Sequence, residues 1–272
     1  MFFTPGRKNG AVVSGVVTST GFDPLSGSIS VNKNTCTAFP AARVRSRKKD
    51  RTGEIVGFIG PNGAGKSTTI KMMTGILIPD SGSVSIDGLN FKKNRKQIMM
   101  KTGVVFGQKS VLCWDIPVLD TLKLFKDMYR VPDAAYKRNM EMFSDILGID
   151  EFISQPPRLL SLGQRMKADL AASLIYDPDI LFLDEPTIGI DVLSKERIRN
   201  FIKKINEERH TTIILTTHDV SDIETLCEKM IIIDKGVLIY DGTLPDLKDR
   251  YQTTDLEEII KKIYIAGERK DA

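Results

Sequence analysis

Short apolar runs alternate with helix-like patterns along most of the chain, from about residue 53 onward. The runs at 54–59, 180–183 and 212–216 are predominantly apolar, which is typical of strands buried on both faces of a parallel sheet. Strands that alternate with helices indicate βαβ units. The pattern therefore predicts an α/β fold with a mostly parallel sheet.

The region between about 110 and 160 has a helical pattern throughout. In its first predicted helix, apolar residues recur with helical spacing and so share one face, at Leu119, Leu122, Phe125, Met128 and Tyr129. We expect this region to form a helical lobe, at about 109–165, inserted into the α/β core.

The last part of the chain predicts a hairpin and then an amphipathic helix. Residues 230–234 and 237–240 flank Lys235-Gly236, which is typical of a hairpin near a sheet edge. Within 251–272, apolar residues then recur at the spacing i, i+3, i+4, i+7, at Leu256, Ile259, Ile260 and Ile263. We expect residues 251–272 to form a C-terminal amphipathic helix.

Residues 1–52 show no sustained period of two or 3.6 and are rich in Gly, Ser, Thr and Asn. We expect an irregular basic segment, so that any N-terminal β region is poorly formed. It carries nine Lys/Arg and two Asp/Glu, so with a whole-chain charge of +4 the remainder is at −3. Such a segment contacts anionic lipid or nucleic acid, or is simply solvated.

Length and composition limit the classes of protein that fit. A chain of 272 residues is long enough for a full α/β core. Its three cysteines have no metal-ligand spacing, which fits a reducing compartment. No apolar run approaches the roughly 18–20 residues that cross a bilayer. We therefore expect a protein with no transmembrane segment.

The sequence GPNGAGKST at 60–68 has the spacing of a nucleotide-phosphate loop. Its glycines let successive N–H groups approach a polyphosphate, and a helix that begins near Lys66 directs its N-terminus at the anion. Lys66 would reach the β- and γ-phosphates, and the Ser67 hydroxyl would bind Mg²⁺. The alternative is a glycine turn that caps a helix. The predicted phosphate-binding residues are Gly60, Pro61, Asn62, Gly63, Ala64, Gly65, Lys66, Ser67 and Thr68.

Two carboxylates follow the predicted strand at 180–183, within Asp179-Ile-Leu-Phe-Leu-Asp-Glu-Pro186. The C-terminal ends of parallel strands are where ligands bind in open α/β sheets. Asp184 would hold Mg²⁺, directly or through water, and Glu185 would act as the general base on the attacking water or polarise it. The alternative is a surface Asp-Glu pair that ends a strand.

The sequence Leu160-Ser-Leu-Gly-Gln164 precedes a predicted helix that runs to about residue 176. Ser161 and Gln164 have the spacing of a capping box, so one interpretation is a well-capped helix. The other is an anion site at the helix N-terminus, suited to the γ-phosphate of a nucleotide bound elsewhere.

The order of these motifs resembles the ATPase domain of ABC transporters over about residues 53–250. The motifs that carry the resemblance are GPNGAGKST, Val105-Phe-Gly-Gln108, LSLGQ, ILFLDEP, Ile188-Gly-Ile-Asp191 and Thr217-His218-Asp219. More narrowly, the chain is similar to ATPase subunits of bacterial exporters of the drug- and antibiotic-resistance type, whose membrane subunits are separate chains. The resemblance implies a P-loop NTPase that hydrolyses ATP to drive transport.

The resemblance also implies roles for single residues. Gln108 would sense Mg²⁺ and the γ-phosphate, and His218 would contact the γ-phosphate, unless it is only a polar residue at a strand end. Asp191 would lie at the dimer contact. The signature residues Ser161, Gly163 and Gln164 would close on ATP bound by a second ATPase subunit.

The implied ligands and partners are ATP, Mg²⁺, a second ATPase subunit (identical or different) and integral membrane permease subunits. Residues 114–117, which include Trp114, lie where this family meets its membrane partner, although a lone Trp is equally often a core residue. The expected location is the cytoplasmic face of the cell membrane, and nucleic acid is not an expected partner.

The resembled domains begin with strands that carry an aromatic residue stacked on adenine, and residues 1–52 contain no recognisable equivalent, although Phe22 and Phe39 are present. Two alternatives therefore stay open. One is a soluble ABC ATPase that acts on ribosomes or DNA, and the other is a subunit that binds ATP with impaired hydrolysis.

Overall fold

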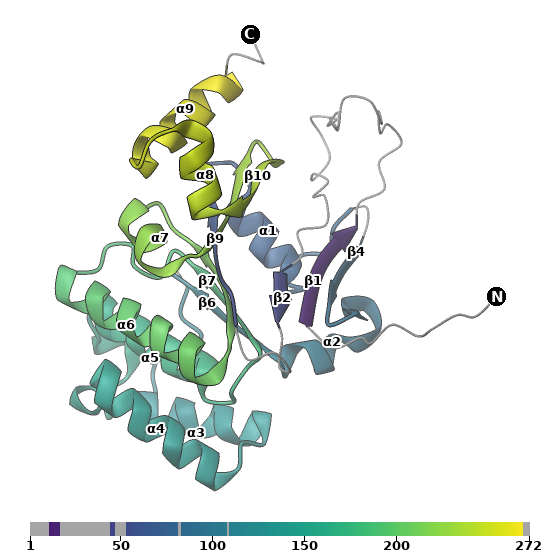
Figure 1. Cartoon of the computed structure of the whole chain (residues 1–272). Helices are drawn as coiled ribbons and strands as arrows, with labels where there is room; N and C mark the ends of the chain where they lie inside the picture. The colour runs from purple at the N-terminus through teal and green to yellow at the C-terminus, as the bar shows by residue number, and fades with distance from the viewer. Residues whose placement is uncertain (1–10, 17–43, 47–52, 81–82, 108, 269–272) are drawn as a thin grey trace.

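The computed structural model describes residues 11–16, 44–46, 53–80, 83–107 and 109–268. At its centre is a six-stranded sheet of order β10-β9-β3-β8-β7-β6 (Figure 1). Its strands are β3 Ile55–Ile59, β6 Thr102–Phe106, β7 Ile180–Asp184, β8 Thr212–Thr216, β9 Lys229–Asp234 and β10 Val237–Thr243. All neighbouring strands are parallel except the β9–β10 hairpin. The predicted parallel sheet and hairpin are confirmed.

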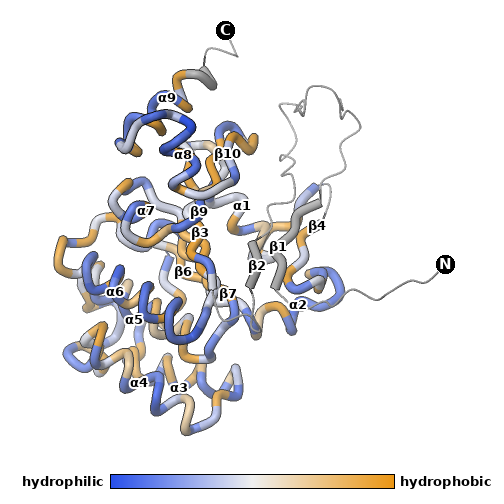
Figure 2. The backbone as a smooth tube through the Cα atoms, in the orientation of Figure 1, coloured by the Kyte–Doolittle hydropathy of each residue, from blue (hydrophilic) through white to orange (hydrophobic). Residues whose placement is uncertain are grey.

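The central strands are continuously apolar because both of their faces are covered. Along β7, Leu181 and Leu183 enter one hydrophobic cluster while Phe182 enters the other. The first cluster includes residues of α5 (Leu162–Leu174) and α6 (Val192–Arg209), and the second includes residues of α1 (Lys66–Met73) and α2 (Phe91–Met99). Figure 2, which colours the backbone by the hydropathy of each residue, shows hydrophobic residues gathered at the sheet. Alternate side chains thus point into two cores, which the sequence displays as an unbroken apolar run.

A helical region lies between β6 and β7 in the chain, as predicted. It consists of α3 Val118–Tyr129, α4 Asp133–Leu147, the 3₁₀ turns η1 Ile149–Glu151 and η2 Pro157–Leu159, and then α5. Phe143 of α4 packs edge-on against Phe201 of α6, with ring centroids 5.8 Å apart. The predicted buried face of α3 is partly wrong. Met128 is 62% exposed and Thr121 is fully buried, because the face that packs is rotated toward Val118, Thr121 and Leu122.

A second sheet of four antiparallel strands has the order β2-β1-β4-β5, formed by β1 Ala11–Val16, β2 Val44–Ser46, β4 Ser83–Ile86 and β5 Leu89–Asn90. The prediction that residues 1–52 form an irregular segment is therefore wrong for the strands at 11–16 and 44–46. β1 pairs with β4, where Ser14 lies opposite Ser85. The strand β1 is therefore stabilised by a segment far away in the sequence and not by its own local pattern. Phe22 and Phe39 lie outside the described residues.

The C-terminal part packs onto the same core. α7 Val220–Leu226 follows β8, and α8 Leu244–Tyr251 and α9 Leu256–Glu268 follow the hairpin. The four apolar residues predicted to form the face of the last helix are all buried in the first cluster. Among the helices of the described ranges, none is long and apolar enough to cross a bilayer.

Candidate functional site

The glycine loop connects β3 directly to α1, the strand-loop-helix context that the motif requires. Gly63 and Gly65 have φ angles of 80° and 100°, in the left-handed region that favours glycine. A Cβ on Gly60 would collide with the carbonyl oxygen of Ile233 in β9. A hydrogen bond connects the loop to Gly236, whose N–H donates to the Ala64 carbonyl at 2.9 Å. Loop shape therefore depends on the β9–β10 turn as well as on its own glycines.

The Lys66 ammonium is buried at the mouth of this loop. Its Nζ donates to the carbonyl oxygens of Gly60 at 2.6 Å and Pro61 at 3.1 Å. Burial lowers the pKa of Lys66, whereas the nearby carboxylates of Glu185 and Asp184 act in the opposite direction. A buried cation hydrogen-bonded to carbonyl oxygens can exchange them for the stronger, charge-assisted bonds that a phosphate offers.

Asp184 ends β7 beside the first turn of α1. Its Oδ1 accepts from the Ser67 hydroxyl at 3.1 Å and from the Thr216 hydroxyl at 2.7 Å. The structure thus brings together Ser67 and Asp184, which are 117 positions apart in the chain. Thr216 was not predicted as a site residue, and its only signal in the sequence is its place at the end of the strand next to β7.

Glu185 and His218 lie next to each other, with His218 Nε2 2.5 Å from Glu185 Oε1. Glu185 has a φ of 55°, a left-handed conformation that is uncommon for residues other than glycine and often found at functional sites. A Cβ on Gly107 would collide with the Glu185 carbonyl oxygen, so only glycine fits there without a backbone shift. Gly107, like Thr216, was not predicted as a site residue. Its neighbour Gln108, a predicted site residue, lies outside the described residues.

The signature residues begin α5. The Ser161 hydroxyl accepts from the N–H of Gln164 at 3.2 Å, and the Gln164 side chain accepts from the N–H of Ser161 at 3.0 Å. This is a complete capping box. Gly163 faces Ser194 and Ile190, so close that a Cβ would lie 3.1 Å from Ser194 Oγ. The signature therefore contacts the segment that leads into α6.

Asp191 is the N-cap of α6, and its side chain accepts from the N–H of Ser194 at 2.9 Å. Hydrogen bonds from Ser194 hold the pKa of Asp191 below its usual value. The next two side chains, Val192 and Leu193, are 80% and 73% exposed. The start of α6 therefore places two neighbouring apolar side chains at the surface, next to the polar cap.

Residues 47–188 match the family model described as ABC transporter. The chain belongs to this family. It is 32% identical over 215 residues to the ABC transporter ATP-binding protein NatA of Bacillus subtilis (strain 168), covering 79% of this chain and 87% of that protein. It is 38% identical over 200 residues to the probable multidrug ABC transporter ATP-binding protein YbhF of Escherichia coli (strain K12), covering 73% of this chain and 34% of that protein.

A solved structure of the ATP-binding subunit of an ABC transporter matches with a TM-score of 0.77 and 23% identity, covering 93% of this chain and 99% of that one. This match shows the fold. The resemblance to ABC ATPases predicted from the motifs is confirmed, and this ABC protein is an ATP-binding ATPase subunit.

A cavity of about 240 Å³ opens beside the Glu185–His218 pair of the ABC ATPase. It is lined by Glu185, Thr187, Ile188, Gly189, Lys195, Thr217, His218 and Asp219. One wall is the segment 187–189 and the other is the loop 217–219, so both segments border the same space.

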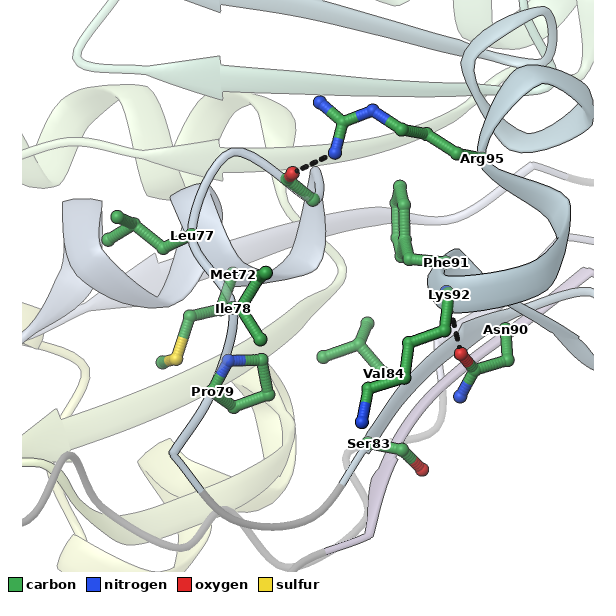
Figure 3. A pocket seen from close by; sticks show the side chains of 11 residues that line it. Met72, Leu77, Ile78, Pro79, Ser83, Val84, Asn90, Phe91, Lys92 and Arg95 are labelled. Carbon is green, nitrogen blue, oxygen red and sulfur yellow. Dashed lines mark hydrogen bonds between the residues drawn. The ribbon is translucent and has the colours of Figure 1, made fainter.

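A separate hollow of about 210 Å³ lies where the chain leaves α1 (Figure 3). Its apolar wall includes Met72, Leu77 and Ile78, and Figure 3 shows Phe91 standing between Arg95 and Lys92. Arg95 donates to the Gly75 carbonyl at 2.8 Å. None of its lining residues belongs to the phosphate loop.

Proposed function

We propose that the chain hydrolyses Mg²⁺-bound ATP as the ATPase subunit of an ABC exporter, in a dimer beneath separate membrane subunits at the cytoplasmic face of the membrane. The Glu185–His218 contact of 2.5 Å, beside Lys66 and Asp184, is the observation that carries the proposal. Phosphoryl transfer requires positioning and charge stabilisation, and this cluster supplies groups for both.

Residues 60–68 would bind the phosphates of ATP through backbone N–H groups and the N-terminus of α1. Lys66 would leave the carbonyl oxygens of Gly60 and Pro61 and pair with the β- and γ-phosphates. Burial lowers the pKa of Lys66 and so disfavours its charged ammonium form. The negative charge of the bound phosphates would act in the opposite direction and favour the ammonium.

The Ser67 hydroxyl and the Asp184 carboxylate suit Mg²⁺, which prefers oxygen ligands. They already lie within hydrogen-bond distance of each other and beside the phosphate loop, so this donor set fits the ion. Gln108 would complete it. When bound, Mg²⁺ would neutralise charge on the phosphates.

Glu185 would take the proton of the attacking water as general base. Its position depends on the positive φ, on the close backbone of Gly107 and on its N–H, which donates to the Thr216 carbonyl at 3.0 Å. His218 would hold this carboxylate and contact the γ-phosphate. At 41% exposure the His218 side chain is accessible to a nucleotide, as this role requires.

Two groups of residues would make the contact with the second subunit. Ser161, Gly163 and Gln164 would meet ATP bound by the second subunit. Asp191 would lie at the contact, flanked by the exposed Val192 and Leu193. The partner is a second copy of this chain or a related ATPase subunit.

The exporter proposal is supported by the likeness to YbhF, described as a probable multidrug transporter protein. Trp114 and Ile116 are 51% and 39% exposed, so contact with a membrane subunit is a better interpretation than a core role. A subunit with impaired hydrolysis would share all these features, and turnover distinguishes it.

Glu185→Gln tests the general-base role. We expect it to keep ATP binding, to lower kcat at least about 100-fold and to accumulate an ATP-bound dimer. Lys66→Ala should instead weaken ATP binding by about tenfold or more, since it removes a charge-assisted phosphate contact. Turnover, nucleotide titration and light scattering with ATP measure the three effects.

The matched control is Glu141→Gln, a change of an exposed glutamate on α4, which should leave turnover and dimerisation unchanged. Parental turnover in Glu185→Gln would refute the base assignment. Absence of turnover in the parent chain with its partner would favour the impaired subunit.

A further inference from the structure

Asp222 is a fully buried carboxylate in α7. Its Oδ2 accepts from the Thr187 hydroxyl at 2.6 Å and from the Thr217 hydroxyl at 2.9 Å. Its Oδ1 accepts from Arg199 Nε at 2.5 Å. A buried charge is tolerated when it is paired and hydrogen-bonded, and Asp222 is both.

The two hydroxyl donors come from the two walls of the 240 Å³ cavity. Thr187 follows the general base by two positions and begins the segment that ends at Asp191. Thr217 immediately precedes His218. A single carboxylate oxygen therefore joins the segment proposed to contact the second subunit to the loop proposed to contact the γ-phosphate.

The third donor connects both segments to α6, the helix that Asp191 caps. Arg199 contacts Asp222 and also donates to the Ser221 hydroxyl at 2.7 Å. One turn earlier, Lys195 donates to Asp219, beside His218, at 3.0 Å. The segment 217–222, which includes the start of α7, is thus held to α6 at two levels, and displacement of this segment would pull on α6.

We propose that Asp222 is a positioning residue that couples the γ-phosphate contact at His218 to the dimer contact at 187–191. This rests on the proposed roles of His218 and Asp191. The Thr187 and Thr217 hydroxyls cannot move apart without one of them losing its hydrogen bond to the buried carboxylate, and a hydrogen bond to a charged group is costly to lose. ATP in the chain's own site would therefore fix the segment that meets the second subunit.

Thr187→Val and Thr217→Val each remove one hydroxyl while keeping the side-chain shape. We expect either variant to lower kcat about tenfold, as for loss of a hydrogen bond to a charged group, with the KM for ATP within about twofold. We expect the double variant to lose about tenfold as well, because both hydroxyls act through one carboxylate. Each should also reduce ATP-driven dimerisation in the Glu185→Gln background.

The control is Thr212→Val, at the first position of β8 and fully buried, whose hydroxyl has no partner among the described residues. It should leave kcat and dimerisation unchanged. Unchanged kcat in Thr187→Val and Thr217→Val, or a multiplicative loss of about 100-fold in the double variant, would overturn the coupling. If Glu185→Gln itself turns over at the parental rate, the proposed general-base role of Glu185 fails instead.

Discussion

The Asp169 carboxylate lies in the middle of α5 with only 3% of its surface exposed. It accepts from the Ser110 hydroxyl at 2.7 Å and from the N–H of Val111 at 2.8 Å. Asp222 has a guanidinium directly bonded to it, whereas Asp169 depends on neutral donors and a more distant Arg165. Burial raises the pKa of Asp169 to about 6, despite these hydrogen bonds. Ionised Asp169 is therefore a cost to the folded state.

The pH dependence of the free energy of unfolding tests whether ionised Asp169 destabilises the folded state. Because its folded-state pKa of about 6 exceeds the ordinary value of 3.8, the native state binds this proton more tightly. The free energy of unfolding should fall as pH rises from about 4 to about 6, by on the order of 3 kcal/mol from this group, and be level above. Asp169→Asn keeps an acceptor for Ser110 and Val111 and removes the titration.

Urea unfolding of parent and Asp169→Asn between pH 4.5 and 8 measures the effect. The stability of the variant relative to the parent should increase through pH 6 and then stay constant. A difference that does not change with pH would show that Asp169 titrates normally.

At the scale of elements, the N-terminus of α5 fits both interpretations of its sequence. The capping box is present, and the same Ser161 is proposed to meet a partner's ATP. Ser161→Asp separates the two, since Asp caps a helix about as well as Ser but puts negative charge where a phosphate would bind. We expect stability within about 0.5 kcal/mol of the parent and loss of most ATPase activity.

Ser161→Ala is the companion variant. It should lose about 1 kcal/mol of stability with the cap, which denaturant unfolding measures. If Ser161→Asp hydrolyses ATP at the parental rate, the serine is a helix cap and no more.

At the scale of the whole molecule, the proposed membrane contact lies at the entrance to α3. Trp114 is half exposed, with the Arg165 guanidinium 5.9 Å from its ring centroid. We expect Trp114→Glu to abolish copurification with membrane subunits from detergent-solubilised membranes, because a charge replaces an exposed apolar contact. ATP binding should be unchanged, because the nucleotide site lies elsewhere.

Val237→Glu provides the control, since Val237 is 36% exposed in the β9–β10 hairpin, away from α3 and α4 (Figure 1). It should copurify as the parent does. Retained copurification of Trp114→Glu would move the contact to another surface.

The local sequence pattern was enough to predict much of the fold and several of the candidate site residues. The runs at β3, β7 and β8 predicted strands because burial on both faces leaves no polar position. The phosphate loop, Asp184 and Glu185 were likewise readable, since their chemistry requires particular residues at fixed spacing along one stretch of chain. Composition and spacing thus determined the α/β class and were enough to predict the ligand-binding groups.

Tertiary structure decided what depends on contacts between distant segments. β1 forms because β4 pairs with it, and Met128 is exposed because α3 packs on a rotated face. Gly107 is required because Glu185 approaches its backbone, and Thr216 joins the site because β8 lies beside β7. Asp222 meets Thr187 across 35 positions. Such contacts leave no periodic trace in the chain, because they are set by which elements become neighbours after folding.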